Sequence, residues 1–320
     1  MATLQNSDAS GQIVAGFDRA LVFSNVQAGR AKARGLIPLV EQAFRNHGLT
    51  SEVRATSSSK EMESQAKEAI QSGAKLVFAL GGDGTLQGLV NAACGHDVVL
   101  GVIPAGGGND FARALGLPRD PLAALNAAIA GEARAVDLVS VRTGDGHTRL
   151  YLGGGGVCLD ADTAQFAGGR YKNWPGRLRY LAAAIRAYAT HTPRRVKVTF
   201  ESSNEVSAWQ ESVLSCVLNT PTFGAGIRLA PKARINDGLL DFVFLEELGL
   251  ARLLRILPRL AFRGTLYIPQ LRTVQFRKLH IETETPAHFH GDGELLGLTP
   301  VEIEIAPRAA RFLAPKLAEA

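Results

Sequence analysis

The strongest constraint on the fold is the alternation of short apolar runs with longer amphipathic stretches through the first 140 residues. This pattern predicts strands at 20–24, 51–55, 75–80 and 98–103, and helices at 30–47, 60–72 and 86–93. Continuous apolar strands alternate with helices in this way when a mainly parallel sheet is covered by helices on both faces. We therefore predict an α/β N-terminal domain.

The pattern changes after Asp137. Short strands are predicted at 139–142, 148–153, 196–201, 213–218, 240–245, 274–282 and 301–305, and only 178–189 and 248–262 have helical spacing. Closely spaced strands separated by turns indicate a second, strand-rich domain. Since no Pro- or Ser-rich linker divides the two halves, we expect them to share an interface.

The composition excludes several classes of protein. With 46% hydrophobic and 20% charged residues, the chain can bury a core and is not disordered. A net charge of +5 favours an anionic partner but is too small to indicate a nucleic-acid binder. There is no signal peptide, no run of eighteen apolar residues and no close pair among the three cysteines, so we expect a cytoplasmic protein.

The first predicted strand-to-helix junction is rich in glycine, and its residues are Gly81, Gly82, Asp83, Gly84 and Thr85. Glycines at such a junction allow a tight turn whose backbone N–H groups and helix N-terminus bind an anion. The carboxylate of Asp83 would repel a phosphate, but a Mg²⁺ ion between the two would remove the conflict. A plain turn in which Asp83 caps its helix is the alternative.

A second glycine junction follows the next predicted strand, with Gly106, Gly107, Gly108, Asn109 and Asp110. Loops that follow neighbouring parallel strands lie at one sheet edge, where such folds bind ligands. Asn109 and Asp110 are also ordinary helix N-caps. Asp137, at the end of a later strand, would add a third carboxylate to this edge.

Two turn sequences follow in the second half of the chain. Residues 236–238 are Asn-Asp-Gly, which is an ordinary turn signal. Residues 291–294, Gly-Asp-Gly-Glu, predict a tight hairpin that exposes two carboxylates. Taken separately, each segment is most simply a turn.

Together, in this order and at these separations, the four segments resemble the diacylglycerol-kinase-like lipid kinase family, the bacterial diacylglycerol kinase type that is related to sphingosine and ceramide kinases. The resemblance runs from about residue 20 to 314. It implies an α/β nucleotide-binding domain, similar to that of NAD kinases and diacylglycerol kinases, over 1–138 and completed by 303–320. It also implies a C-terminal β-sandwich lipid-binding domain over 139–302.

The resemblance implies that ATP binds to the residues that match the family's nucleotide loops: Asn25, Val26, Gln27, Ala28, Gly29, Thr56, Gly81, Gly82, Asp83, Gly84, Thr85, Gly88, Gly106, Gly107 and Asn109. Three positions depart from the family pattern. Val26 replaces a proline, Gly88 stands where a glutamate is usual, and Gly107 replaces a threonine. A lost neutral hydrogen bond at Gly107 costs about 0.5–1.5 kcal/mol, which predicts a several-fold higher nucleotide KM.

The same resemblance implies two Mg²⁺ sites. Asp83, Asp110 and Asp137 match carboxylates that hold the catalytic Mg²⁺ through water. A second, structural Mg²⁺ would be held by Asp237 with the backbone carbonyls of Arg234 and Leu239. The catalytic residues would be Asp83, Asp292 and Glu294, and the choice between Asp292 and Glu294 as general base is open.

The implied activity is transfer of the γ-phosphate of ATP to a hydroxyl of a membrane lipid. Diacylglycerol, ceramide, a sphingoid base and phosphatidylglycerol all remain open as acceptors. The alternatives are an enzyme similar to NAD kinase and an inactive lipid or nucleotide sensor.

Two basic stretches, at 170–197 and 252–278, are relevant to where in the cell the protein is expected. Aromatic residues are interleaved with the cations of the first stretch, and the second begins in a helical, apolar segment. Basic amphipathic segments of this kind predict contact with an anionic membrane surface. We therefore expect a cytoplasmic protein peripherally bound to the inner face of the membrane, without a nucleic-acid partner. A homodimer is left open.

Overall fold

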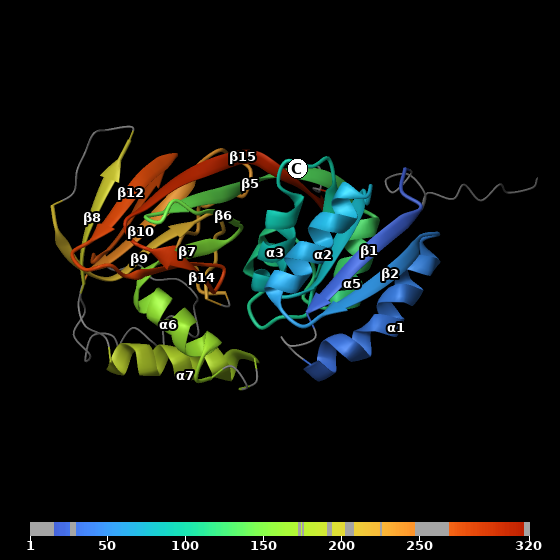
Figure 1. Cartoon of the computed structure of the whole chain (residues 1–320), viewed down its shortest axis with the longest axis horizontal. Coiled ribbons are helices and arrows are strands. Elements are labelled where there is room, and N and C mark those ends of the chain that lie inside the picture. The colour runs from blue at the N-terminus through green and yellow to red at the C-terminus, as the bar shows by residue number, and fades with distance from the viewer. Residues whose placement is uncertain are drawn as a thin grey trace, which may run out of the picture.

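The structure is a computed structural model that describes residues 16–25, 30–171, 174, 176–190, 194–201, 208–224, 226–246 and 269–316. Its helices and strands form two halves, and a long strand near the C-terminus, β15, runs from one half to the other (Figure 1).

The N-terminal half is a parallel sheet with helices packed against it. Its strands are β1 (Arg19–Asn25), β2 (Thr50–Thr56), β3 (Leu76–Gly81) and β4 (Val99–Pro104), in the spatial order β2-β1-β3-β4. The helices are α1 (Arg30–Asn46), α2 (Ser59–Gln71), α3 (Asp83–Ala93), α4 (Asp110–Ala114) and α5 (Pro121–Ile129). Every residue of β3 and β4 is buried, which explains why these strands are continuous apolar runs. The predicted parallel α/β domain is confirmed.

The C-terminal half is built from antiparallel strands. They are β5 (Glu132–Thr143), β6 (Thr148–Tyr151), β7 (Gly154–Cys158), β8 (Arg194–Phe200), β9 (Gln210–Leu218), β10 (Leu240–Glu246), β11 (Leu271–Phe276), β12 (Lys278–Thr283), β13 (His288–Gly291), β14 (Glu294–Leu298) and β15 (Val301–Ala314). Their Val, Ile, Leu and Phe side chains form a second hydrophobic core. Helices α6 (Leu159–Gly168) and α7 (Gly176–Ala189) pack against each other below these strands (Figure 1). The predicted β-sandwich-like second domain is confirmed.

Several element boundaries differ from the sequence predictions. The stretch 274–282 is two strands, β11 and β12, which are separated at Arg277. Helix α3 already begins at Asp83, and β5 already begins at Glu132. Helix α4 begins at the second predicted strand-to-helix junction, whereas α5, α6 and β7 were not predicted from the sequence. Strand β7 is Gly-Gly-Gly-Val-Cys, which carries too few β-branched or aromatic residues to give a strand signal. The helix predicted at 248–262 lies outside the described residues.

Strand β15 belongs to both halves. It pairs antiparallel with β5 and β12, and Arg311 and Phe312 pair in parallel with β4. A bulge between Ala306 and Ala310 interrupts the pairing with β5 and divides the strand in two. Beyond it, Phe312 is fully buried in the N-terminal core, edge-on to Phe111 with ring centroids 5.1 Å apart. The segment of β15 beyond the bulge thus packs in the N-terminal core, whereas Ile303 and Ile305 pack in the second core. That residues 303–320 complete the first domain stays a prediction, and 317–320 lie outside the described residues.

We expect Phe312→Ala to lower the free energy of unfolding by about 3–5 kcal/mol, because it leaves a cavity where a buried ring was. Arg311→Ala is the matched control on the same strand. It removes a solvent-exposed ion pair with Asp97, and such pairs contribute about 1 kcal/mol or less. Urea denaturation of both variants measures the difference. Equal losses would contradict an anchoring role for Phe312.

Candidate active site

Two glycine turns touch at the carboxyl ends of β3 and β4. A Cβ atom on Gly106 would lie 2.5 Å from the Cα of Gly82, so Gly106 has no room for a side chain, and a Cβ atom on Gly82 would lie 3.2 Å from the Cα of Gly106. Asn109 closes the second turn with its side-chain amide, which accepts from the Gly106 N–H (3.1 Å) and donates to the Gly106 carbonyl (2.9 Å). The loops therefore lie together, as the order of parallel strands predicts.

Asp83 connects these two turns. It is the first residue of α3, and it does not cap its own helix, because the N-cap is Gly82 and no side chain caps it. The Asp83 carboxylate instead accepts from the backbone N–H groups of Asp110 (3.2 Å) and Phe111 (3.3 Å). A carboxylate is stabilised by the free N–H groups at the start of a helix, so Asp83 caps its neighbour, α4.

Carboxylates from both halves crowd around Asp83. Burial raises the pKa of Asp83 to about 7, with repulsion by the charges of Asp292 and Asp110 adding to the effect of burial. Burial also raises the pKa of Asp292 to about 6, against the lowering effect of three backbone hydrogen bonds. Crowded carboxylate oxygens are the ligands that Mg²⁺ prefers. The donor chemistry of this site therefore fits a divalent cation.

Asp292 lies at the tip of the β13–β14 hairpin. Asp292 and Gly293 both have positive φ (50° and 86°), as the tight turn predicted from the sequence requires. The Asp292 carboxylate accepts from the N–H groups of Leu152 (2.7 Å), Gly153 (2.9 Å) and Gly154 (3.2 Å). Its own N–H donates to the carbonyl of Gly154 (2.8 Å). These bonds fix the orientation of the carboxylate.

Glu294 is the hairpin residue whose side chain lies next to the first glycine turn. It is exposed, and its Oε1 would lie 3.2 Å from a Cβ atom on Gly84. The same position is 3.8 Å from the backbone oxygen of Asp292. The structure thus brings the hairpin of Asp292 and Glu294, in the C-terminal half, to the Asp83 turn in the N-terminal half.

Asp110 is held in an interaction that also joins the two halves. Its Oδ1 accepts from Arg113 Nη1 (2.5 Å) and from the hydroxyl of Thr222 (2.6 Å), which follows β9. Arg113 also donates to the carbonyl of Gly108 (3.2 Å). Thr222 is not predictable from the sequence, since an isolated threonine in a loop carries no signal.

Asp137 has a different environment. It is buried in β5, and its carboxylate accepts from the N–H groups of Gly238 (2.7 Å) and Arg308 (2.8 Å). Asp137 therefore ties the loop 235–239 to the bulge of β15. Within the described ranges, no three His, Cys, Asp or Glu side chains form a group that could hold one metal ion directly.

The predicted second metal site is on an exposed loop. Asp237 accepts from the backbone N–H of Leu239 (3.1 Å), and Arg234 is exposed on the same loop. Nearby, burial raises the pKa of Asp241 to about 6, a hydrogen bond from Gln275 lowers it, and the charge of Asp237 raises it further. The neighbouring Asp237 and Asp241 carboxylates also offer the oxygen ligands that Mg²⁺ prefers.

The predicted nucleotide residues on β1 and β2 lie at one sheet edge. Asn25 ends β1, beside Thr56 at the end of β2. Thr56 is buried, and its hydroxyl donates to the carbonyl of Ser24 (3.4 Å). Residues 26–29, which include Val26, Gln27, Ala28 and Gly29, lie outside the described residues.

Gly88 occupies a position where helices pack. It lies in α3, and a Cβ atom there would be 2.5 Å from the terminal methyl group of Met62 on α2. Gly81 also lies in a crowded position, since a Cβ atom there would lie 2.5 Å from the hydroxyl of Thr85. The structure thus places Gly88 where α3 packs against α2, beside the flexible end of the Met62 side chain.

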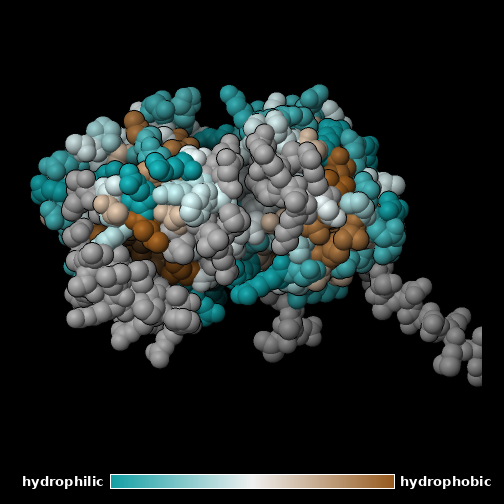
Figure 2. All heavy atoms as spheres, turned by 90° about the horizontal axis from the view of Figure 1, so that it is seen from below, coloured by the Kyte–Doolittle hydropathy of each residue, from teal (hydrophilic) through white to brown (hydrophobic). Residues whose placement is uncertain are grey.

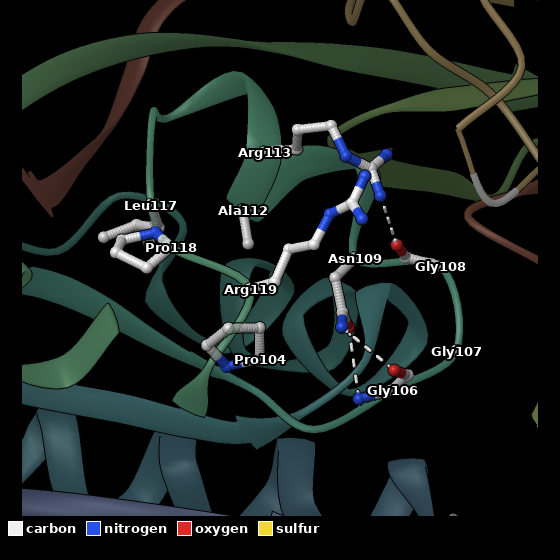
Figure 3. A pocket seen from close by; sticks show the side chains of 10 residues that line it. All are labelled: Pro104, Gly106, Gly107, Gly108, Asn109, Ala112, Arg113, Leu117, Pro118 and Arg119. Atoms are coloured by element: carbon white, nitrogen blue, oxygen red, sulfur yellow. Dashed lines mark hydrogen bonds between the residues drawn. The ribbon is translucent and has the colours of Figure 1, made fainter. Parts of the chain in front are cut away.

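A pocket of about 170 Å³ adjoins the second glycine turn (Figure 3). Its lining residues are Pro104, Gly106, Gly107, Gly108, Asn109, Ala112, Arg113, Leu117, Pro118 and Arg119. Figure 3 shows the side chains of Arg113 and Arg119 reaching toward the same region above Asn109. Arg113 is already paired with Asp110, so Arg119 is the guanidinium at this pocket that suits an anionic ligand. Arg119 is not predictable from the sequence, because a single arginine after a helix has no distinguishing pattern.

Comparison with known proteins agrees with this arrangement. Residues 19–141 match the model of the diacylglycerol kinase catalytic domain, and residues 156–314 match that of the YegS C-terminal NAD kinase beta sandwich-like domain. A crystal structure of a diacylglycerol kinase from Bacillus anthracis has the same fold. It is 22% identical, with a TM-score of 0.67 over 93% of this chain and 97% of that one.

Curated relatives are similar over most of their length. The diacylglycerol kinase of Bacillus subtilis is 30% identical over 302 residues, covering 93% of this chain and 97% of the relative. The lipid kinase YegS of Escherichia coli is 30% identical over 294 residues, covering 89% and 93%. The diacylglycerol kinase of Mycobacterium tuberculosis is 28% identical over 250 residues, covering 78% and 79%. The chain therefore belongs to the family of diacylglycerol kinases and YegS-type lipid kinases.

Proposed function

We propose that this kinase transfers the γ-phosphate of ATP to the hydroxyl of a membrane lipid, either diacylglycerol or a related lipid alcohol. The observation that carries the proposal is the meeting of the Asp292–Glu294 hairpin with the Asp83 turn. Phosphoryl transfer requires a phosphate cradle, neutralisation of charge and a base for the attacking hydroxyl. The backbone N–H groups of the glycine turns suit a phosphate cradle. The carboxylates of the turns suit a cation that neutralises charge, and those of the hairpin suit a base.

The glycine turns would hold the nucleotide. Backbone N–H groups of the first turn, at the start of α3, suit the phosphates, and Arg119 suits an anion at the adjoining pocket. Asp83 and Asp110 would hold Mg²⁺ beside the phosphates, and Asp237 would hold a structural Mg²⁺. The ion beside the phosphates, when bound, would neutralise the charge that develops on the transferred group.

Asp292 is the general base in this proposal. Its raised pKa, about 6 as a result of burial, leaves it ionised at neutral pH while making it a better proton acceptor than an ordinary aspartate. The three backbone N–H donors fix the direction of its carboxylate. Glu294, which is more exposed, would orient the acceptor hydroxyl.

Apolar side chains beside these carboxylates support a lipid acceptor over a soluble one such as NAD. Leu295 and Leu298 follow Glu294 on β14 and are 42% and 45% exposed. Large aliphatic side chains left in water beside a catalytic group are suited to contact hydrocarbon.

Peripheral membrane contact is part of the same proposal. Trp174 is 50% exposed and Ile185 on α7 is 63% exposed, and the side chains of Arg170 and Arg186 are exposed as well. Figure 2 shows hydrophobic residues among hydrophilic ones on the half of the molecule that carries these helices. No helix in the described part of the chain is long and apolar enough to cross a membrane.

The proposed activity is tested with γ-labelled ATP, Mg²⁺ and each lipid in mixed micelles, with NAD as the soluble alternative. We expect Asp292→Asn to lower kcat about 10²–10⁴-fold, because a general base contributes about that much, and to leave the KM for ATP unchanged. Glu284→Gln, in an exposed ion pair with Arg195, should retain full activity. Labelling of NAD alone would contradict the lipid assignment.

The raised pKa of Asp83 also predicts how stability depends on pH. The folded value of about 7, raised by burial and neighbouring carboxylates, exceeds the unfolded value of about 3.9. The folded state therefore binds this proton more tightly, and stability present below about pH 4 is lost as pH rises through 7.

In EDTA at pH 8, we expect Asp83→Asn to be more stable than the wild type by about 1–2 kcal/mol, after allowing for solvent screening. At pH 5 the difference should shrink, because the wild-type carboxyl is then protonated. Urea unfolding at several pH values measures this. A difference that does not vary with pH would rule out repulsion as its cause.

Membrane contact is tested by cosedimentation with vesicles of phosphatidylglycerol and phosphatidylcholine. We expect Trp174→Ala combined with Ile185→Ser to weaken vesicle binding several-fold, because both side chains would otherwise bury in the interface. Trp209→Ala is the control, since Trp209 is also exposed but packs near Lys197. An equal loss in the control would count against α7 as the contact surface.

A further inference from the structure

A buried polar pair connects α6 to the hairpin that carries Asp292. His290 Nε2 on β13 lies 3.0 Å from Asp160 Oδ2 in the first turn of α6, and the two side chains are 3% and 4% exposed. Cys216 Sγ on β9 donates to the same oxygen at 3.0 Å. The pair therefore joins a helix and two strands inside the second half.

Stability alone does not account for this pair. Asp160 Oδ1 and His290 Nδ1 are buried without a hydrogen-bond partner in the described part of the molecule, and a buried polar atom without a partner is costly. Replacing buried ion pairs with apolar residues of similar volume is often neutral or stabilising. Burial of the Asp160–His290 pair therefore costs free energy of folding, and a role other than stability must explain why the pair is present.

The backbone is arranged to allow the contact. Cys158, at the junction of β7 and α6, has φ 77° and ψ −132°, a conformation that L residues rarely adopt and that is maintained only when the surroundings enforce it. A Cβ atom on Gly156 would lie 2.5 Å from Asp160 Oδ2, so only glycine leaves room for the carboxylate beneath β13.

Besides this pair, the tip of the hairpin is held by the hydrogen bonds of Asp292 to residues 152–154, and Phe289 on β13 is buried against Tyr151. Strand β13 pairs with β7 only at His290 with Gly156 and at Gly291 with Gly155. Strand β14, beyond it, lies at the end of the sheet order. The side chain of His290 is a lateral contact between α6 and β13, the strand that ends at Gly291, next to Asp292.

We propose that Asp160 and His290 are positioning residues, whose hydrogen bond seats β13 against α6 and holds the Asp292 carboxylate in place for proton transfer. This inference rests on the proposed function. A displacement of about 1 Å in a catalytic group can cost about 10²-fold in rate, so a loose hairpin lowers kcat without affecting the nucleotide turns.

Two conservative variants separate the hydrogen bond from mere packing. His290→Gln places an amide nitrogen at the reach of Nε2, the atom that contacts Asp160, whereas His290→Asn reaches only as far as Nδ1. We expect the Gln variant to keep most of the wild-type kcat and the Asn variant to lose about ten- to a hundredfold. The KM for ATP should stay within about twofold of the wild type in both.

A second readout does not depend on activity. The backbone N–H groups of Leu152, Gly153 and Gly154 donate to the Asp292 carboxylate, so their hydrogen exchange reports whether it is seated. We expect exchange about tenfold faster in His290→Asn and unchanged in His290→Gln. Equal exchange and equal kcat in the two variants would overturn the positioning role. A wild type that labels no lipid while exchange still differs between them would overturn the proposed function alone.

Discussion

Strand β15 is the constraint on which the candidate site depends, because it is hydrogen-bonded to strands of both domains. On one side of its bulge it pairs with β5 and β12, and on the other Phe312 lies in the N-terminal core beside Phe111. Asp137 bonds to the N–H of Arg308 within the bulge and so fixes the turning point. With the domains held in this way, Glu294 reaches the Gly84 turn.

The site combines repulsion with rigid backbone support. Burial raises the pKa of both Asp83 and Asp292, and the negative charges of neighbouring carboxylates raise the pKa of Asp83 further. Backbone N–H groups hold both carboxylates, from the start of α4 for Asp83 and from the 152–154 segment for Asp292. A cation bound among these carboxylates would relieve the repulsion that raises the pKa of Asp83.

Glycines make these approaches possible, and their roles were only partly predictable. The sequence indicates that the turns at 81–84 and 106–108 lie at one sheet edge, because parallel strands end on the same side. It does not indicate that Gly82 and Gly106 touch, or that Gly156 leaves space for Asp160. Gly88, a departure from the family pattern, lies where α3 packs against Met62 of α2, a contact that the sequence does not indicate either.

The sequence by itself determined the class of the two domains, the turns and the family, because periodicity, turn chemistry and motif order are local properties. It also supplied the acidic residues of the site. Only the tertiary structure decided how they are grouped, with Asp83, Asp110 and Asp292 together and Asp137 bonded to the loop at 235–239. Residues without a motif, such as Thr222 and Asp160, acquire a role only through long-range contacts. Hydrogen bonds between distant segments depend on how whole domains pack, and no short stretch of sequence encodes that packing.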